Sequence, residues 1–380
     1  MRVAKVVPYF FPAMSFGGPA KVVYEFSKEL AQKHEVTVLT SDAFTVSRRI
    51  APTEKLPETK NFKVHYFRNV VNSAAYTQRL FTHFSLVPFV LKNKDSFDIY
   101  HFHDVFVLPH IVLGIILKIL HKRYIISPHG ILDPVRLQKK SLVKSLLLPL
   151  VFFMFSGAEK LVATSQKEAD DLQSLGFKNV VTVYNGIGTS SVKTNNRFKK
   201  MANKEKVTLL FIGKLHPQKG LYPFLQALYK AKASTFQLLI AGIDDGDESR
   251  LTEFVQQNTM KNVTFLGYVN EADKQSLYEI SDCFIHPSDS EGFSISILEA
   301  LQSGIPVLIT EACNFDDVKK YNAGTVLPDN KVKTISDALK KVTHKQLSLQ
   351  KKNTKKLITD NFTIAIMAEN LEELYAQAIK

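Results

Sequence analysis

Two glutamates eight positions apart, Glu291 and Glu299, have the types and spacing best suited to chemistry in this sequence. The residues around them predict a short buried strand, a polar loop, a helix over 293–303 and a second strand. Gly292 lies where the loop turns into the helix. Free backbone N–H groups and the positive end of the helix dipole would therefore face a ligand at this point, and a phosphate group fits there.

The direction of the second carboxylate follows from helix geometry. At about 100° per residue, Glu299 falls away from the apolar stripe of Ile297, Leu298 and Leu301. We therefore expect it to point outward, into solvent or into a cleft. Two such carboxylates suit a ligand with an anionic middle and hydroxyl groups at both ends, such as a nucleotide-diphosphate sugar. The plainer alternative is that Glu291 only favours the helix dipole and Glu299 lies on a solvated face.

The whole string favours the functional interpretation. EGFSISILEALQSGIPVL, residues 291–308, resembles the signature of the family-4 retaining glycosyltransferases, in which E-x7-E precedes a small-residue turn, a proline and a buried strand. The resemblance implies that Glu291 reaches the donor sugar and that Glu299 reaches the nucleotide ribose. It also implies donor contacts at the helix start, from Gly292, Phe293 and Ser294.

Three further segments match this family in the same order along the chain. Gly17 and Gly18 precede an expected helix; an ordinary turn is the alternative, but in the family this loop lies beneath the donor phosphate and the acceptor. His129, in SPHG, corresponds to a histidine that contacts the reacting sugar. Lys214 and Lys219, in GKLHPQKG, correspond to two cations on the donor diphosphate. A lysine at 214 replaces the more usual arginine and cannot form a bidentate fork to phosphate.

Weaker matches complete the predicted site. His103 and Asp104, in IYHFHD, match an H-x-H-[DE] variant and suggest an acceptor or cleft contact, although single histidines are more often structural. Gly267, in GYV, matches the turn where the nucleotide base meets backbone groups. Asp133 either caps the helix that follows it or orients His129.

Strand and helix patterns alternate along the 380 residues, which predicts doubly wound parallel sheets in an α/β protein. One helix is expected near 78–92. The resemblance implies two Rossmann-like domains facing across a cleft, the GT-B fold. We expect an acceptor-side domain over 1–190, a linker over 191–205, a nucleotide-sugar domain over 206–362, and a C-terminal helix over 363–380 that returns to the first domain.

Composition narrows the class of function. With 45% hydrophobic and 22% charged residues the chain is typical of soluble globular proteins. The net charge of +13 suits an anionic partner, but no nucleic-acid recognition motif is present, so nucleic acid is not an expected partner. Asp245 and Asp247 spell D-x-D, yet they lie where the family has a variable acidic turn. We expect no metal and no cofactor. Two widely spaced cysteines and no apparent leader favour a cytoplasmic protein.

One segment raises the question of membrane contact. Residues 136–155, RLQKKSLVKSLLLPLVFFMF, place four cations before a dense apolar run that contains Pro149. The run is shorter than the roughly 20 residues needed to span a bilayer. It is either a core helix with a basic start or a peripheral helix on an anionic membrane surface. The second option would place the protein at the inner face of the membrane.

The expected function is therefore retaining, metal-independent transfer of a hexosyl group. The donor would be a UDP- or GDP-linked sugar, and the acceptor a polysaccharide or a lipid-linked glycan. Two alternatives stay open: a nucleotide-sugar epimerase of the same architecture, and a binding-only relative without catalysis.

Overall fold

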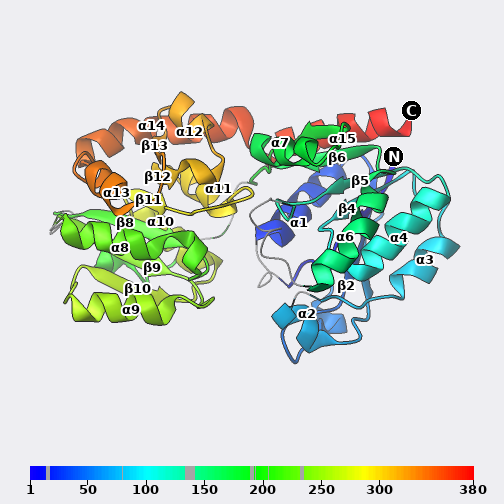
Figure 1. Cartoon of the computed structure of the whole chain (residues 1–380), viewed down its shortest axis with the longest axis horizontal. Helices are drawn as coiled ribbons and strands as arrows, with labels where there is room; N and C mark the ends of the chain where they lie inside the picture. The colour runs from blue at the N-terminus through cyan, green and yellow to red at the C-terminus, as the bar shows by residue number, and fades with distance from the viewer. Residues whose placement is uncertain are drawn as a thin grey trace. The chain divides into compact units, whose positions relative to one another are not determined.

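The computed structural model describes residues 1–13, 18–78, 80–132, 142–188, 192, 194–203, 205–231 and 235–380. They form two compact units (Figure 1). The first unit comprises Met1–Gly188 and Ile364–Lys380, and the second comprises Thr189–Thr363. Each unit contains one parallel sheet flanked by helices.

The sheet of the first unit has the strand order β3-β2-β1-β4-β5-β6-β7. Its strands are β1 (Arg2–Val6), β2 (Glu35–Ser41), β3 (Phe62–Phe67), β4 (Ile99–His103), β5 (Tyr124–Ser127), β6 (Lys160–Ala163) and β7 (Val180–Thr182). The helices are α1 (Gly18–Leu30), α2 (Asn72–Gln78), α3 (Leu86–Lys92), α4 (Leu108–Ile119), α6 (Leu142–Phe155), α7 (Gln166–Ser174) and α15 (Ile364–Ile379).

The sheet of the second unit has the strand order β10-β9-β8-β11-β12-β13. Its strands are β8 (Val207–Ile212), β9 (Phe236–Ala241), β10 (Val263–Gly267), β11 (Cys283–His286), β12 (Val307–Thr310) and β13 (Gly324–Leu327). The helices are α8 (Leu221–Lys230), α9 (Glu248–Gln257), α10 (Glu271–Ile280), α11 (Ile295–Gln302), α12 (Asp317–Lys320), α13 (Val332–Leu339) and α14 (His344–Asn361). Short 3-10 turns occur in both units: η2 (Pro52–Glu54), η3 (Lys199–Met201), η4 (Pro217–Lys219) and η5 (Glu311–Cys313).

In both sheets the strand order reverses once, at β1 in the first unit and at β8 in the second. Because parallel crossovers are right-handed, helices before and after the reversal cover opposite faces. This confirms the expected α/β class with two Rossmann-like domains. In such sheets, ligands bind outside the carboxyl ends of the strands at the reversal. The loops after β1 and β4, and those after β8 and β11, are therefore the places to look for a site.

The central strands show why the alternation of strands and helices could be predicted from the sequence. Every residue of β8, VTLLFI, is buried, as expected for a parallel strand covered on both faces. The expected single helix near 78–92 is wrong: the chain forms α2 and α3 instead. Pro88 explains the break, because a proline inside a continuous helix lacks the N–H for the i→i−4 bond and clashes with the preceding turn.

Helix α6 has one side buried in the core of the first unit and one side exposed. Val151, Met154 and Phe155 are buried in the core of the first unit. On the other side Leu146 is 79% exposed and Phe153 is 47% exposed. Residues 136–141 of the segment lie outside the described part of the chain. Among the described residues no helix is long and apolar enough to cross a membrane.

Lys5, on β1, has a fully buried side chain. Its Nζ lies 3.0 Å from His101 Nδ1 and donates to the Tyr375 hydroxyl of α15. The ammonium also lies 4.2 Å from the centre of the Phe26 ring. No carboxylate pairs with Lys5 among the described residues, so burial holds its pKa well below the ordinary value. The charged form is therefore destabilised in the folded protein.

This arrangement predicts that Lys5→Met stabilises the protein at neutral pH. The folded chain binds a proton on Lys5 less readily than the unfolded chain does, so this residue costs stability below its unfolded pKa. We expect a gain of about 1–4 kcal/mol in the free energy of unfolding at pH 7. The gain should shrink as the pH rises toward 10. Urea unfolding from pH 6 to pH 10 measures it, and a pH-independent difference would contradict the buried-base account.

Candidate active site

Glu291 is the centre of a buried polar cluster in the loop after β11. Its Oε1 accepts from Lys219 Nζ at 2.5 Å and from Ser288 Oγ at 2.7 Å. His286 Nε2 lies 2.9 Å from the same oxygen. The three partners all use Oε1, and no described residue is hydrogen-bonded to Oε2. One carboxylate oxygen is thus fixed by the protein and the other is available to a ligand.

The charge state of this cluster is set by its neighbours. Burial opposes ionisation of Glu291, but the charge of Lys219 and the hydrogen bond with His286 outweigh it, and its pKa is lowered. Burial lowers the pKa of His286, although Glu291 partly opposes this effect. At neutral pH the cluster therefore holds an ionised carboxylate beside a cationic lysine and a neutral imidazole.

Two loops are joined to place Lys219 next to Glu291. Gln218 links them through backbone and side chain: its carbonyl accepts from Asp289 N at 2.8 Å, and its Nε2 donates to the Ser290 carbonyl at 3.1 Å. Gly220 has φ +68°. A Cβ on this residue would lie 1.9 Å from the Pro287 carbonyl oxygen, so only glycine allows the loops to come this close.

The start of α11 offers backbone donors beside this carboxylate. The N–H groups of Gly292 and Ser294 donate no hydrogen bond to any described residue, and helix starts favour anions. The ring of Phe293 instead packs on Phe315 and Phe362, with centroids 4.8 and 5.8 Å away. A donor contact from Phe293 would therefore come from its backbone.

Glu299 does not point into solvent, one of the two directions expected for it. It is only 7% exposed and lies beneath α10, where both of its oxygens accept from Lys274 Nζ at 3.0 Å. Tyr278 Oη donates to its Oε2 at 3.3 Å. Helix geometry could not exclude the solvent direction, because it compared Glu299 only with the apolar stripe and could not include Lys274, which makes a buried carboxylate acceptable.

Two other predicted donor residues lie at the carboxyl ends of strands in the second unit. Lys214 follows β8 and its Nζ is 3.7 Å from Asp245 Oδ2, with both side chains exposed. Asp247 pairs instead with Arg250. Gly267 ends β10 with φ +66° and open space where a side chain would project. No group of three His, Cys, Asp or Glu side chains in the described chain is arranged to hold a metal ion.

The first unit brings His103 and His129 together at the ends of β4 and β5. His103 Nδ1 lies 3.0 Å from His129 Nε2, and the two rings are stacked. Asp104 has φ +69°, and its carboxylate caps the N–H of Val105. Gly18 is the first residue of α1. Gly17 and Asp133 lie outside the described residues.

Sequence reasoning missed two side chains that hold the site residues in place. His286 is the last residue of β11 and contacts Glu291; its position at a strand end was the available signal. Glu168, on α7, is buried and accepts from Gly130 N at 2.6 Å and from Thr164 N at 2.7 Å. It ties the His129 loop to the end of β6. Nothing in the local sequence distinguishes Glu168 from an ordinary helical glutamate.

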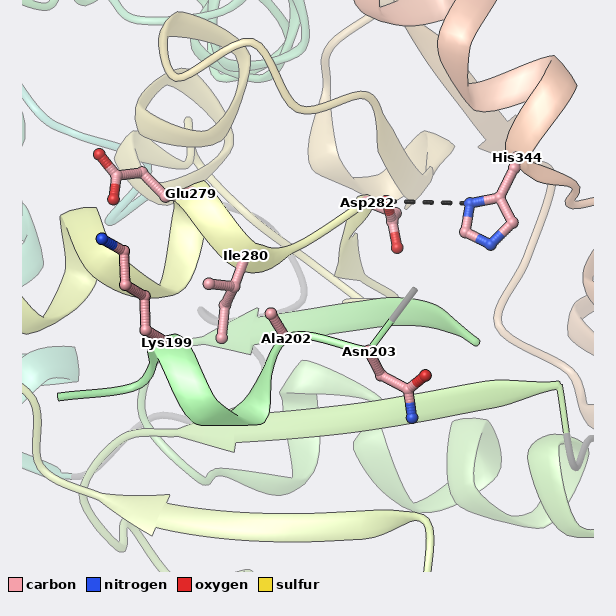
Figure 2. A pocket seen from close by; sticks show the side chains of 7 residues that line it. All are labelled: Lys199, Ala202, Asn203, Glu279, Ile280, Asp282 and His344. Atoms are coloured by element: carbon pink, nitrogen blue, oxygen red, sulfur yellow. Dashed lines mark ion pairs between the residues drawn. The ribbon is translucent and has the colours of Figure 1, made fainter. Parts of the chain in front are cut away.

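A cavity of about 550 Å³ lies elsewhere in the second unit (Figure 2). It opens at the amino ends of the strands, opposite to the loops that carry Lys219 and Glu291. Figure 2 shows lining side chains of both charges, among them Lys199, Glu279 and Asp282. It is separate from the predicted site.

Solved structures share this architecture. Sucrose-phosphate synthase from Thermosynechococcus elongatus matches with a TM-score of 0.78 and 16% identity, covering 99% of each chain. Anabaena HepE in complex with UDP and glucose matches with a TM-score of 0.75 and 18% identity, again over 99% of each chain. Together with the two reversed parallel sheets, these likenesses define the GT-B fold.

Sequence comparisons add the family. The family described as Glycosyltransferase Family 4 matches residues 16–191, and Glycosyl transferases group 1 matches residues 192–359. The chain belongs to the family-4 glycosyltransferases, as its motifs indicated. O-antigen chain mannosyltransferase C of Escherichia coli is 25% identical over 100% of this chain and 99% of its own length. A second Escherichia coli protein, UDP-Gal:alpha-D-GlcNAc-diphosphoundecaprenol alpha-1,3-galactosyltransferase, is 27% identical over 44% of this chain and 45% of its own.

Proposed function

We propose that this glycosyltransferase moves a hexosyl group from a UDP- or GDP-linked sugar to a growing polysaccharide or a lipid-linked glycan, with retention of configuration and without a metal. The observation that carries the proposal is the Lys219–Glu291 pair at the carboxyl edge of the second sheet, beside the amide donors of α11. The names of the relatives support the acceptor class, since they act in O-antigen assembly or on a diphosphoundecaprenol glycan.

Each group has a place in the proposed reaction. The bond between the sugar C1 and the diphosphate oxygen breaks while the acceptor oxygen forms a bond to C1 on the same face. The acceptor proton passes to the departing phosphate, so no enzymatic nucleophile is required. Lys219, Lys214 and the amides at Gly292 and Ser294 stabilise the charge that grows on the diphosphate. Glu291 uses its second oxygen to position the sugar.

The remaining groups complete the donor and acceptor subsites. Glu299, oriented by Lys274, accepts from the nucleotide ribose, and Gly267 leaves space for the base. In the first unit His129 contacts the reacting sugar. We assign His103 and Asp104 to acceptor contacts and Gly18 to a contact with the donor phosphate.

A transfer assay tests the proposal. UDP-, GDP- and ADP-linked hexoses are offered with a diphosphoundecaprenol-linked glycan or a polysaccharide, with and without EDTA. We expect one nucleotide class to support transfer, unaffected by EDTA, and proton NMR to show the same anomeric configuration in donor and product. Epimerised donor without acceptor would indicate the epimerase alternative. Nucleotide binding without transfer to any acceptor would indicate a binding-only protein.

We further propose that α6 rests on an anionic membrane surface at its cytoplasmic side, where a lipid-linked acceptor would be presented. Leu146, Leu150 and Phe153 recur at helical spacing and are exposed. Lys118 lies beside them, its Nζ 3.7 Å from the centre of the Phe153 ring. In the sequence, the four cations between 136 and 144 are not interrupted by an acid. Apolar area with adjacent cations is what anionic interfaces bind.

Vesicle binding tests the contact between α6 and the membrane. The double variant Leu146→Ser with Phe153→Ser should bind phosphatidylglycerol vesicles about 10-fold or more weakly, because each exposed apolar side chain contributes about 1 kcal/mol or more when buried in the interface. Leu349→Ser is the control, since Leu349 is similarly exposed but lies on α14 of the second unit. Sedimentation with vesicles measures both. Equal loss in the two proteins, or no loss in either, would contradict membrane contact through α6.

A further inference from the structure

His103 and His129 share a single hydrogen bond inside the first unit, and only one of the two nitrogens can donate it. The bond joins His103 Nδ1 to His129 Nε2 at 3.0 Å. Each ring has a second nitrogen that takes no part in this bond: Nε2 of His103 and Nδ1 of His129. His103 Nε2 is completely buried and has no partner in the described part of the chain. His129 Nδ1 makes no hydrogen bond with any described residue, and the residue is only partly buried.

Each of these two rings carries one proton at neutral pH. Burial lowers the pKa of His129 to about 4. Burial also lowers the pKa of His103 well below its ordinary value, and the nearby His129 and Lys5 act in the same direction. Two neutral tautomer pairs are then possible. Either His103 donates from Nδ1–H to His129 Nε2, or His129 donates from Nε2–H to His103 Nδ1.

The buried Nε2 of His103 decides between the two pairs. If His129 were the donor, the proton of His103 would sit on Nε2, where a buried N–H would have no acceptor. If His103 is the donor, its buried Nε2 carries only a lone pair, and the defect is an acceptor without a donor. An orphaned buried N–H is the rarer and costlier of the two defects. The first pair is therefore favoured, and it leaves the proton of His129 on Nδ1.

We infer that His103 is a positioning residue that fixes the proton of His129 on Nδ1, so that His129 presents an N–H donor to the substrate and not a basic nitrogen. The inference rests on the proposed function for its chemical meaning: the atom that faces the ligand donates to an oxygen of the reacting sugar or its phosphate. His129 then orients and stabilises; it does not take up the acceptor proton.

The backbone conformation at His129 and Gly130 helps to hold the His129 side chain beside His103. His129 and Gly130 both have positive φ, +56° and +71°. Glu168 holds the tight turn by accepting from Gly130 N at 2.6 Å. A non-glycine residue in the left-handed region is held there only by its surroundings. The Glu168 contact therefore helps to hold the turn from which the His129 side chain projects toward His103.

Nitrogen NMR on the histidine-labelled full chain tests the tautomer directly. The His129 signals are assigned by their loss in His129→Gln. His103→Asn places an amide N–H near the original Nδ1–H, and His103→Asp places an acceptor there. We expect a protonated Nδ1 and an unprotonated Nε2 in the wild-type protein and in His103→Asn, and the reverse in His103→Asp. A wild-type His129 protonated on Nε2, or an unchanged tautomer in His103→Asp, would overturn the inference.

Turnover of His103 variants distinguishes a positioning role of His103 from a packing role. His103→Asp should lose on the order of 10²-fold more turnover than His103→Asn, the typical cost of one preorganised donor. His110→Asn is the control, because His83 and His110 form a buried pair with Nε2 atoms 3.1 Å apart and no bond to His129. Equal losses in His103→Asn and His103→Asp would reduce His103 to a packing role. Should the wild-type chain transfer no sugar, the proposed function fails while the NMR result still decides the tautomer.

Discussion

Replacing Lys219 with alanine is expected to lower turnover about 10²–10³-fold, the usual cost of removing one electrostatic contact to the transition state. Lys219 Nζ is held 2.5 Å from Glu291 Oε1, and the Lys219 side chain is 23% exposed. Its removal takes away a cation from the departing diphosphate. It also leaves the buried Glu291 with only His286 and Ser288, so its orientation toward the sugar is weakened. The measurement is kcat and KM for the donor at saturating acceptor.

The control for this variant is Lys319→Ala. Lys319 pairs with Glu311 at 2.8 Å on the surface of the same unit, so it reports the cost of losing an ordinary lysine–carboxylate pair. Surface pairs contribute little, about 0–1 kcal/mol. We expect wild-type turnover and a melting temperature close to wild type from Lys319→Ala. Lys219→Ala should still fold but melt at a lower temperature, because it leaves the buried Glu291 without its cation. A Lys219→Ala protein that is folded and fully active would count decisively against the proposed mechanism.

Gly220→Ala, which adds a single methyl group, should lower turnover about as much as Lys219→Ala. The Cβ in Gly220→Ala would meet the Pro287 carbonyl oxygen at 1.9 Å, and the residue would be held at φ +68°. Left-handed backbone and forced displacement together are expected to cost about 2–5 kcal/mol in the free energy of unfolding. The displaced loop carries Ser288 and Glu291, and a shift of about 1 Å in a positioning group can cost 10²-fold in rate.

Gly176→Ala separates the cost of the left-handed backbone from the cost of displacing the Pro287 loop. Gly176 has φ +96° but no atom within 4 Å of an added Cβ, so this variant reports backbone strain alone. It should lose about 1–2 kcal/mol and keep its activity. Urea unfolding and turnover are measured on both variants. If Gly220→Ala proved no less stable and no less active than Gly176→Ala, the close approach of the two loops would not matter to the site.

Much of the fold could be predicted because buried parallel strands have a simple sequence pattern. Strands such as β8 are apolar throughout, and the glycine-rich loops that follow them are readable as turns. The break between α2 and α3 was missed although Pro88 signals it, since the apolar pattern on both sides suggested continuity. Motif resemblance then located Lys219 and Glu291, which the structure joins in one ion pair.

Partners that come from distant parts of the chain could not be predicted in the same way. Lys274 neutralises Glu299 from another helix, and His286 and Glu168 act by contacts that no local spacing encodes. The tautomer of His129 depends on a buried nitrogen of His103 that finds no partner. These contacts arise when segments distant in the sequence pack together, so only the folded structure reveals them.

Calorimetric titration with UDP, GDP and ADP tests the central claim, that the Lys219–Glu291 cluster and the start of α11 bind a nucleoside diphosphate. We predict that one of the three binds the wild-type protein and Lys319→Ala with equal affinity and without added metal. Its binding to Lys219→Ala should be about 10-fold weaker or more, since a charge-assisted hydrogen bond contributes about 1.5–3 kcal/mol. Equal affinity of the wild-type and Lys219→Ala proteins, or no binding of any of the three, would contradict the account.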